Sequence, residues 1–288
     1  MPVPVKQTSK GTIKKKAGSV VDRIKAIGNE DSFMKILLYG VSGSGKTTFW
    51  ATMPGPILAV ICSGGNKTGE TRSINTPEYR KKIKTVTLND SSELKDLVEY
   101  AESSDAFKTI VLDHVSGLQD LILKEILGLD EIPAQKGWGL ASQQQYGQCT
   151  AQAKEYLRAL LNLNCNVAIL GQERTFGGKD DGLNSDIIQP TVGPAVVPSL
   201  AGWLNPACDY ILQMYKRPRM ITTYTTMGTG DKAKKIATVK RGKGVMYCAR
   251  CEPHDTFITK FRVPRGIELP EYVEDPTYDK LIKIIKGE

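Results

Sequence analysis

Short runs of apolar residues recur along the chain, and most are separated by segments with helical periodicity. The runs at residues 36–39, 57–61, 109–112 and 166–170 are rich in Ile, Leu and Val and contain almost no polar residue. Unbroken apolar runs of this length are typical of strands that are buried on both faces of a parallel sheet. The sequence therefore predicts a central, mainly parallel sheet.

Two more strands and a series of helices complete the pattern. Strands are expected at 84–88 and 209–214, and the helices expected between and after the strands cover 91–101, 118–129, 150–162, 197–204 and 278–286. Regular alternation of strands and helices predicts an α/β fold with helices on both faces of the sheet. Residues 132–148 and 176–186 are predicted to be loops, because Gly and polar residues interrupt any period there.

The two ends of the chain differ from this core. Residues 220–226 and 235–240 alternate around a glycine-containing turn at 228–231, which predicts a hairpin, and 256–263 predicts a further strand. Residues 1–19 contain too few apolar residues to form a core and predict a mobile tail, followed by a short helix at 20–27. The expected organisation is a basic tail over 1–30 and one domain over 31–288.

The loop after the first strand matches a phosphate-binding motif. Gly40, four further residues and then Gly45, Lys46 and Thr47 form the pattern G-x-x-x-x-G-K-[ST], the P-loop. Its backbone N–H groups surround phosphate, Lys46 reaches the β- and γ-phosphates, and the Thr47 hydroxyl is a ligand for Mg²⁺. We therefore predict ATP and Mg²⁺ as cofactors, and expect the nucleotide to contact Gly40, Ser42, Gly43, Ser44, Gly45, Lys46, Thr47 and Thr48.

A second acidic position supports the metal site. Asp113 directly follows the apolar run at 109–112 and fits a Walker B aspartate, which holds the Mg²⁺ water shell at the carboxyl edge of a parallel sheet. An aspartate at the end of a strand can equally cap the following helix. The P-loop upstream favours the metal role, so Thr47 and Asp113 are the predicted metal ligands.

Charge is distributed unevenly along the chain. The formal net charge is +8, yet residues 215–250 alone hold ten Lys or Arg against one acidic residue, and residues 1–30 hold seven against two. Such concentration favours a polyanionic partner over general solubility. With no 18-residue apolar run and no signal-peptide pattern, the sequence predicts an intracellular, cytoplasmic protein that does not bind membranes.

The six cysteines are scattered and mostly lie in apolar segments, which is typical of small core residues in a reducing compartment. Cys248, Cys251 and His254, with Asp255 as a fourth ligand, have the spacing of half a zinc site. The second cysteine pair of a structural zinc site is missing, so two incidental thiols are the favoured interpretation.

Several of these features together resemble a known family. They are the P-loop, the segment 113–118 with the sequence Asp-His-Val-Ser-Gly-Leu, a glutamine (Gln172) after the strand at 166–170, and Lys260-Phe-Arg262 after a basic hairpin. This combination resembles the RecA-like branch of the P-loop NTPases, and within it the phage RecA-like ATPases associated with single-strand annealing and recombination. The resemblance covers about residues 33–288.

The resemblance implies an ATPase that binds single-stranded DNA as a head-to-tail homo-oligomer, either a ring or a filament. It implies catalytic roles for Lys46 and Asp113, a γ-phosphate sensor at Gln172, and Lys260 and Arg262 as cations that reach a neighbouring subunit's nucleotide. It also places DNA contacts in loops 132–148 and 175–187, and makes a single-strand DNA-binding protein a candidate partner in a bacterial host cytoplasm. Trp138 and Tyr146 could stack on bases or simply pack within their loop.

One departure from the family concerns the catalytic glutamate, which is expected just after the second strand. Here that strand is followed by Cys62-Ser-Gly-Gly, with no acid. Glu70, Glu173 or a water held by His114 and Gln172 could substitute, or hydrolysis could be slow. A P-loop kinase or a nucleotide-dependent switch that does not act on DNA remains the alternative function, and the basic charge of residues 215–250 favours the DNA-binding one.

Overall fold

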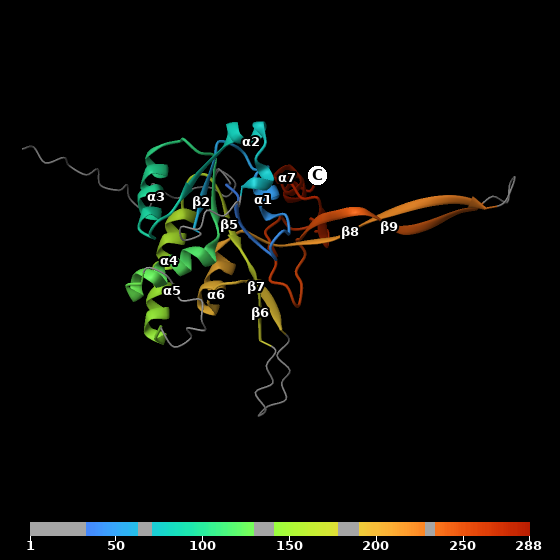
Figure 1. Ribbon diagram of the computed structural model, residues 1–288. Coiled ribbons are helices and arrows are strands. Elements are labelled where there is room, and N and C mark those ends of the chain that lie inside the picture. Colours follow the sequence, from blue (N-terminus) through green and yellow to red (C-terminus); the bar gives the residue numbers. More distant parts are fainter. Residues whose placement is uncertain (1–32, 63–70, 130–140, 178–189, 228–233) are drawn as a thin grey trace, which may run out of the picture. The chain divides into compact units, whose positions relative to one another are not determined.

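The computed structural model describes residues 33–62, 71–129, 141–177, 190–227 and 234–288, which form one compact unit (Figure 1). A nine-stranded sheet runs through it in the order β11-β9-β8-β1-β5-β4-β2-β3, and β10 pairs with β8. The six strands from β8 to β3 in this order are parallel to their neighbours, whereas β9, β10 and β11 are antiparallel. The sheet strands are β1 (Lys35–Tyr39), β2 (Ile57–Ile61), β3 (Ile83–Thr87), β4 (Thr109–Asp113), β5 (Asn166–Gly171), β8 (Tyr210–Met227), β9 (Lys234–Arg250), β10 (Lys260–Phe261) and β11 (Tyr272–Glu274).

Helices cover both faces of this sheet because successive side chains of each strand point to opposite faces. In β1, for example, Leu37 belongs to one hydrophobic cluster and Leu38 to the other. One cluster includes residues of α3 (Glu93–Ser103), α4 (Val115–Leu127), α5 (Gln143–Leu161) and α6 (Pro198–Ala207). The other includes residues of α1 (Lys46–Trp50), the 3₁₀ turn η2 (Arg72–Ile74) and α7 (Tyr278–Lys286), and α2 (Pro77–Lys82) lies near this second group. The predicted α/β fold with a mainly parallel sheet is thus confirmed.

The antiparallel part begins where β8 continues past the sheet. Beyond Met214 the strand runs on with β9 as a two-stranded ribbon that extends away from the sheet (Figure 1). The register is shifted between Pro218 and Met220, and from there outward the ribbon exposes large apolar side chains such as Ile221 and Tyr224. A second, two-stranded sheet pairs β6 (Glu173–Phe176) with β7 (Thr191–Pro194).

Several predicted boundaries were wrong. The predicted loop at 132–148 enters helix α5 already at Gln143, because Ser142 and Gln145 form a reciprocal capping box. The hairpin at 220–240 is correct but far too short, since β9 continues to Arg250. The strand predicted at 256–263 is reduced to two residues, Lys260–Phe261.

Other predictions concern parts of the chain outside the described residues. These are the mobile tail and short helix within 1–30, Glu70, Trp138, the turn at 228–231 and most of the loops at 132–148 and 175–187. Within the described part of the chain, no helix is long and apolar enough to cross a membrane.

Candidate nucleotide-binding site

The P-loop joins β1 to α1 at the carboxyl edge of the parallel sheet. Gly43 and Gly45 have φ angles of 72° and 92°, in the left-handed region that glycine adopts without strain. Gly45 is the N-cap of α1, and no side chain caps this helix end. Phe49 and Trp50 are fully buried and anchor the short helix in the core. The loop is therefore held by both of its ends. Apart from the Ser44 N–H, which donates to the Val41 carbonyl oxygen (3.3 Å), its backbone N–H groups are available for an anion.

A cavity of about 420 Å³ opens in front of this loop. It collects side chains from the ends of β4 and β5, from η2 and from β9, and thus from segments that lie far apart in the sequence. Of the eight residues predicted to bind nucleotide, all but Gly40 line it, as do Asp113 and Gln172. Its lining consists of Ser42, Gly43, Ser44, Gly45, Lys46, Thr47, Thr48, Ser73, Asp113, His114, Leu170, Gln172 and Tyr247.

Lys46 is the buried cation of this cavity. Its side-chain nitrogen Nζ donates hydrogen bonds to the carbonyl oxygens of Gly40 (2.7 Å) and Val41 (3.0 Å). Burial lowers the pKa of Lys46 below its ordinary value, while the nearby carboxylates of Asp113 and Glu173 act in the opposite direction. The ammonium group thus already lies at the loop, where two carboxylates partly offset the effect of burial on its pKa.

The residues of the loop and of β4 suit a nucleotide with its metal ion. The Thr47 hydroxyl and the Asp113 carboxylate line the same cavity and are the oxygen donors that Mg²⁺ prefers. Ser44 Oγ is buried and has no hydrogen-bond partner in the described structure, which is unusual for a hydroxyl and fits a site that is completed by a polar ligand. Asp113 therefore lies where a Walker B aspartate is needed.

Gln172 and His114 lie on the side of the cavity formed by β4 and β5, whereas Glu173 lies near enough to act on the pKa of Lys46 but does not line the cavity. Glu173 accepts a hydrogen bond from Gln213 Nε2 (3.1 Å) and is not part of the cavity lining. His114 Nδ1 accepts the Gly117 N–H (2.9 Å) and so caps α4. Of the three substitutes for the catalytic glutamate, Glu70 lies outside the described residues, and of the other two only the His114 and Gln172 pair lines the cavity at the phosphate loop.

Lys260 and Arg262 lie far from their own P-loop. Lys260 is paired with Ile211 near the start of β8, at the amino edge of the sheet, whereas the P-loop follows the carboxyl end of the parallel neighbour β1. Lys260 donates to the carbonyl oxygens of three residues of the same chain, and Arg262 forms an ion pair with Asp209. Neither side chain can act on the nucleotide of its own chain, and a role at a neighbour's nucleotide stays a prediction.

The sequence interpretation missed Tyr247, Ser73 and Lys216 near the loop. Tyr247 and Ser73 line the cavity, and the Lys216 ammonium would lie 3.9 Å from a Cβ placed on Gly43. Tyr247 and Lys216 lie directly opposite each other on β9 and β8. Only the pairing of these two strands brings them to the site, so no local motif could have indicated it.

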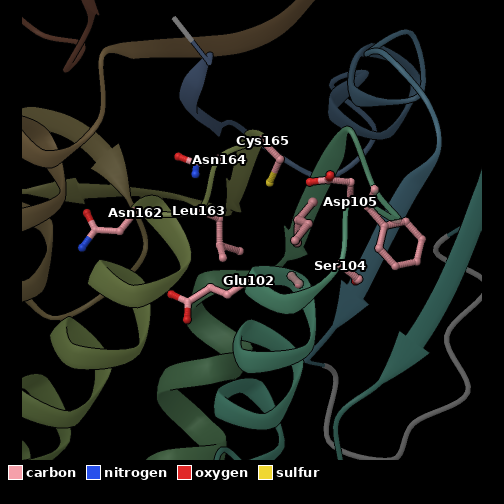
Figure 2. Close-up of a pocket in the computed structure, with 10 residues that line it drawn as sticks. Glu102, Ser104, Asp105, Asn162, Leu163, Asn164 and Cys165 are labelled. Carbon is pink, nitrogen blue, oxygen red and sulfur yellow. The ribbon is translucent and has the colours of Figure 1, made fainter. Parts of the chain in front are cut away.

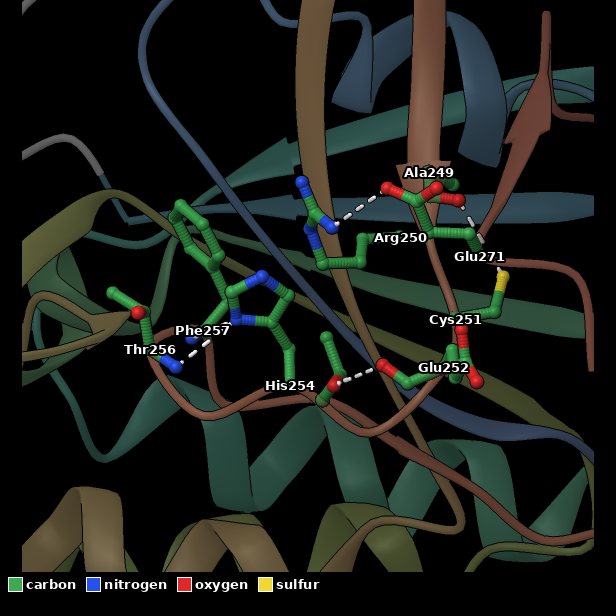
Figure 3. A network of polar contacts seen from close by, with 9 residues as sticks. Ala249, Arg250, Cys251, Glu252, His254, Thr256, Phe257 and Glu271 are labelled. Atoms are coloured by element: carbon green, nitrogen blue, oxygen red, sulfur yellow. Dashed lines mark hydrogen bonds and ion pairs between the residues drawn. The ribbon is translucent and has the colours of Figure 1, made fainter.

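The half zinc site does not assemble in the described residues. Cys248 and Cys251 are both buried, and burial raises the pKa of each thiol, for Cys251 to about 12. His254 Nδ1 instead accepts the backbone N–H of Thr256 (3.0 Å; Figure 3). Among the described residues, no group of three or more Cys, His, Asp or Glu side chains could hold a metal ion.

A second cavity, of about 260 Å³, lies at the amino edge of the sheet between the ends of α3 and α5 (Figure 2). Its lining includes the carboxylates of Glu102 and Asp105 and no lysine or arginine. Because two carboxylates repel a phosphate group, this cavity does not suit a nucleotide. The cavity at the P-loop, which Lys46 lines, suits one.

The fold and this cavity define a P-loop NTPase, with the phosphate loop, Asp113 at the end of β4 and the polar end of β5 around one space. A family model described as an AAA domain matches residues 32–263, which include every element from β1 to β10. The chain belongs to this AAA-domain family and is a nucleotide-binding ATPase. A search of curated proteins found no match.

Proposed function

We propose that the protein is an ATP- and Mg²⁺-dependent ATPase that binds single-stranded DNA and is stimulated by it, in recombination or strand annealing of the phage type. The observation that carries the DNA part is the β8–β9 ribbon, which leaves the edge of the nucleotide site and presents exposed cations and an exposed tyrosine. The ATPase part follows from the family and from the cavity at the P-loop.

The cations of the ribbon fall into two groups. Some are already used within the protein: Arg219 pairs with Asp275 (3.0 Å), and Arg250 pairs with Glu271 (3.3 Å). Lys240, Arg241 and Lys243 are exposed and form no ion pair within the described residues. The second group is therefore available for an external polyanion such as a nucleic-acid backbone.

Tyr224 adds a surface on which a base can stack. Its side chain is 70% exposed and lies on the same ribbon as Lys240 and Arg241. Aromatic rings beside a cationic track hold single strands without reading their sequence. We therefore expect binding that tolerates many sequences and weakens steeply with salt.

For hydrolysis, the residues of this chain have separable roles. Lys46 neutralises phosphate charge, the loop N–H groups orient the phosphates, and Gln172 with His114 orients the attacking water. Mg²⁺, when bound, neutralises charge on the β- and γ-phosphates. Assembly into a head-to-tail oligomer would add Lys260 and Arg262 of a neighbouring subunit to this site.

The test is ATP turnover with and without single-stranded DNA, together with DNA affinity measured over a series of salt concentrations. Log K falls by about 0.7 per neutralised phosphate for each unit of log salt concentration. A Lys240→Gln/Arg241→Gln/Lys243→Gln variant should have a flatter slope and less stimulation by DNA. Lys46→Ala should abolish turnover and keep the wild-type salt slope when nucleotide is omitted.

Two outcomes would count against the proposal. Wild-type turnover that does not respond to single-stranded DNA would favour a kinase or a nucleotide switch. An unchanged salt slope in the triple variant would move the DNA contact away from the ribbon.

A further inference from the structure

The base of the ribbon lies directly against the phosphate-binding loop, and glycines of the loop make this approach possible. A Cβ on Gly40 would lie 2.1 Å from the carbonyl oxygen of Met214, and one on Gly45 would lie 2.8 Å from Cδ1 of Tyr247. No side chain fits at either position. At Gly43, by contrast, the nearest group is the Lys216 ammonium, at 3.9 Å from such a Cβ.

The strand register explains why Lys216 reaches the loop. The parallel pairing of β1 with β8 ends with Tyr39 opposite Gln213. Beyond this pair the chain of β1 turns into the P-loop, whereas β8 continues straight, so that Met214 to Lys216 run alongside the loop. Lys216 lies opposite Tyr247 in the antiparallel ribbon, which places both side chains on one face, and Tyr247 lines the nucleotide cavity.

Lys216 is also chemically suited to a phosphate. It is exposed, and in the described residues it forms no ion pair with a carboxylate. Lys46 is buried beneath the loop and is bonded to two loop carbonyls. The loop therefore has a cation on each side, one fixed in the core and one on the ribbon.

We propose that Lys216 contacts the terminal phosphate of a bound nucleoside triphosphate within the same chain, and that the ribbon thereby responds to whether triphosphate or diphosphate is bound. The inference rests on the proposed function and specifies how nucleotide binding at the P-loop is coupled to DNA binding on the ribbon. The loop N–H groups and Lys46 serve the β- and γ-phosphates from the core, and the flexible stem of Lys216 adds a second charge over the open side of Gly43, where the γ-phosphate would lie. A diphosphate lacks the group that this ammonium would bind.

The experiment compares the affinities of a non-hydrolysable ATP analogue and of ADP in wild type, Lys216→Gln, Lys216→Arg and Lys95→Gln. A hydrogen bond to a charged group contributes about tenfold or more to affinity. Lys216→Gln should therefore lower the affinity for the triphosphate analogue by that factor and the affinity for ADP by far less. Lys216→Arg should recover part of the loss. Lys95→Gln, the same change at an exposed lysine of α3 that forms no ion pair within the described residues, should leave both affinities unchanged.

Hydrogen exchange provides a readout besides affinity. In wild type, amides of residues 214–217 and 245–249 should exchange more slowly with the triphosphate analogue than with ADP, and Lys216→Gln should remove this difference. Equal losses for both nucleotides, or no loss, would overturn the inference. Loss of DNA affinity alone would overturn it too and would leave the proposed function intact. Wild-type ATP turnover that does not respond to single-stranded DNA would instead refute the proposed function. The comparison of affinities for the triphosphate analogue and ADP would still test the role of Lys216.

Discussion

Lys260 stabilises the C-terminal end of helix α6 from a position more than fifty residues away in the sequence. Replacing this lysine tests whether it serves the stability of its own chain or the nucleotide site of a neighbouring subunit. Its Nζ donates to the carbonyl oxygens of Asn205 (3.0 Å), Pro206 (3.2 Å) and Cys208 (2.7 Å). The last carbonyls of a helix lack partners within the helix, and α6 has no basic residue in its own last turn. Lys260 supplies this missing charge.

Replacing Lys260 with Met keeps the length of the side chain and removes the three hydrogen bonds. Hydrogen bonds to charged groups contribute about 1.5–3 kcal/mol, but the carbonyls here are partly accessible to water, so we expect a total loss of about 2 kcal/mol in the free energy of unfolding. For a domain of this size the melting temperature should fall by roughly 4–8 °C. Differential scanning calorimetry measures the change. Lys243→Met, which removes an exposed lysine without an ion pair, is the matched control and should shift it by less than about 2 °C.

The same variants test the predicted trans-acting cation. Arg262 pairs with Asp209 on a largely exposed surface, so Arg262→Ala should cost less than about 1 kcal/mol. If these residues serve a neighbour's nucleotide, mixing Lys46→Ala with Arg262→Ala protein should restore turnover that neither has alone. Full stability of Lys260→Met together with lost turnover would refute the capping role. Reduced stability with no recovery in the mixture, while both proteins still co-assemble, would refute the trans role.

Two further predictions concern packing and thiol chemistry. In Gly117→Ala the new Cβ would lie 2.3 Å from the Cys62 carbonyl oxygen, so the free energy of unfolding should fall by more than about 2 kcal/mol. Gly147→Ala, inside α5 with open space around it, should raise the free energy of unfolding by about 0.5–1 kcal/mol. Chemical denaturation of both variants measures the difference, and equal effects would contradict the packing at Gly117. All six cysteines are buried, and burial raises the pKa of the Cys149 thiol to about 11 and that of the Cys208 thiol to about 12. A thiol reagent at pH 8 should therefore label the native protein slowly, and it should label six thiols after denaturation. Fast labelling of the native protein would contradict this burial. Because thiols in the unfolded chain lose their protons at lower pH than these buried thiols, the free energy of unfolding should fall as the pH rises above about 9.

The strands around the P-loop could be predicted because their signal is local. An apolar run such as 36–39 or 109–112 is buried on both faces, and the motif that follows it has fixed spacing. The start of α5 could not be placed, because the capping box of Ser142 and Gln145 outweighs the Gly and Gln content that suggested a loop. Within the strand predicted at 256–263, backbone pairing is reduced to a bridge between Phe257 and Val192 and to the pairing of Lys260–Phe261 with β8, and between them Thr259 Oγ1 donates to the Glu252 carbonyl (2.7 Å).

The part of the site that the sequence did not reveal depends on contacts between distant segments. Lys216 and Tyr247 carry no motif, and they meet the P-loop only because β8 is parallel to β1 and antiparallel to β9. The length of the ribbon was missed for a related reason. Residues 220–226 and 235–240 alternate and were predicted, whereas nearer the sheet Pro218, Gly242 and Gly244 interrupt the pattern on which strand prediction depends, and only the pairing of β8 with β9 shows that the strands continue.

The pairing of the outer ribbon also determines how its length could change in evolution or by design. Thr222 lies opposite Val239, and Thr223 lies opposite Thr238. Deleting these two opposed pairs together removes one full repeat of the pleat, so the remaining side chains keep their faces and the hydrogen-bond ladder keeps its alternation. Deleting one pair alone would exchange the two faces of everything beyond it. The ribbon can therefore lengthen or shorten in steps of two residues per strand. The distance that it extends from the sheet can vary in this way while the nucleotide site stays the same.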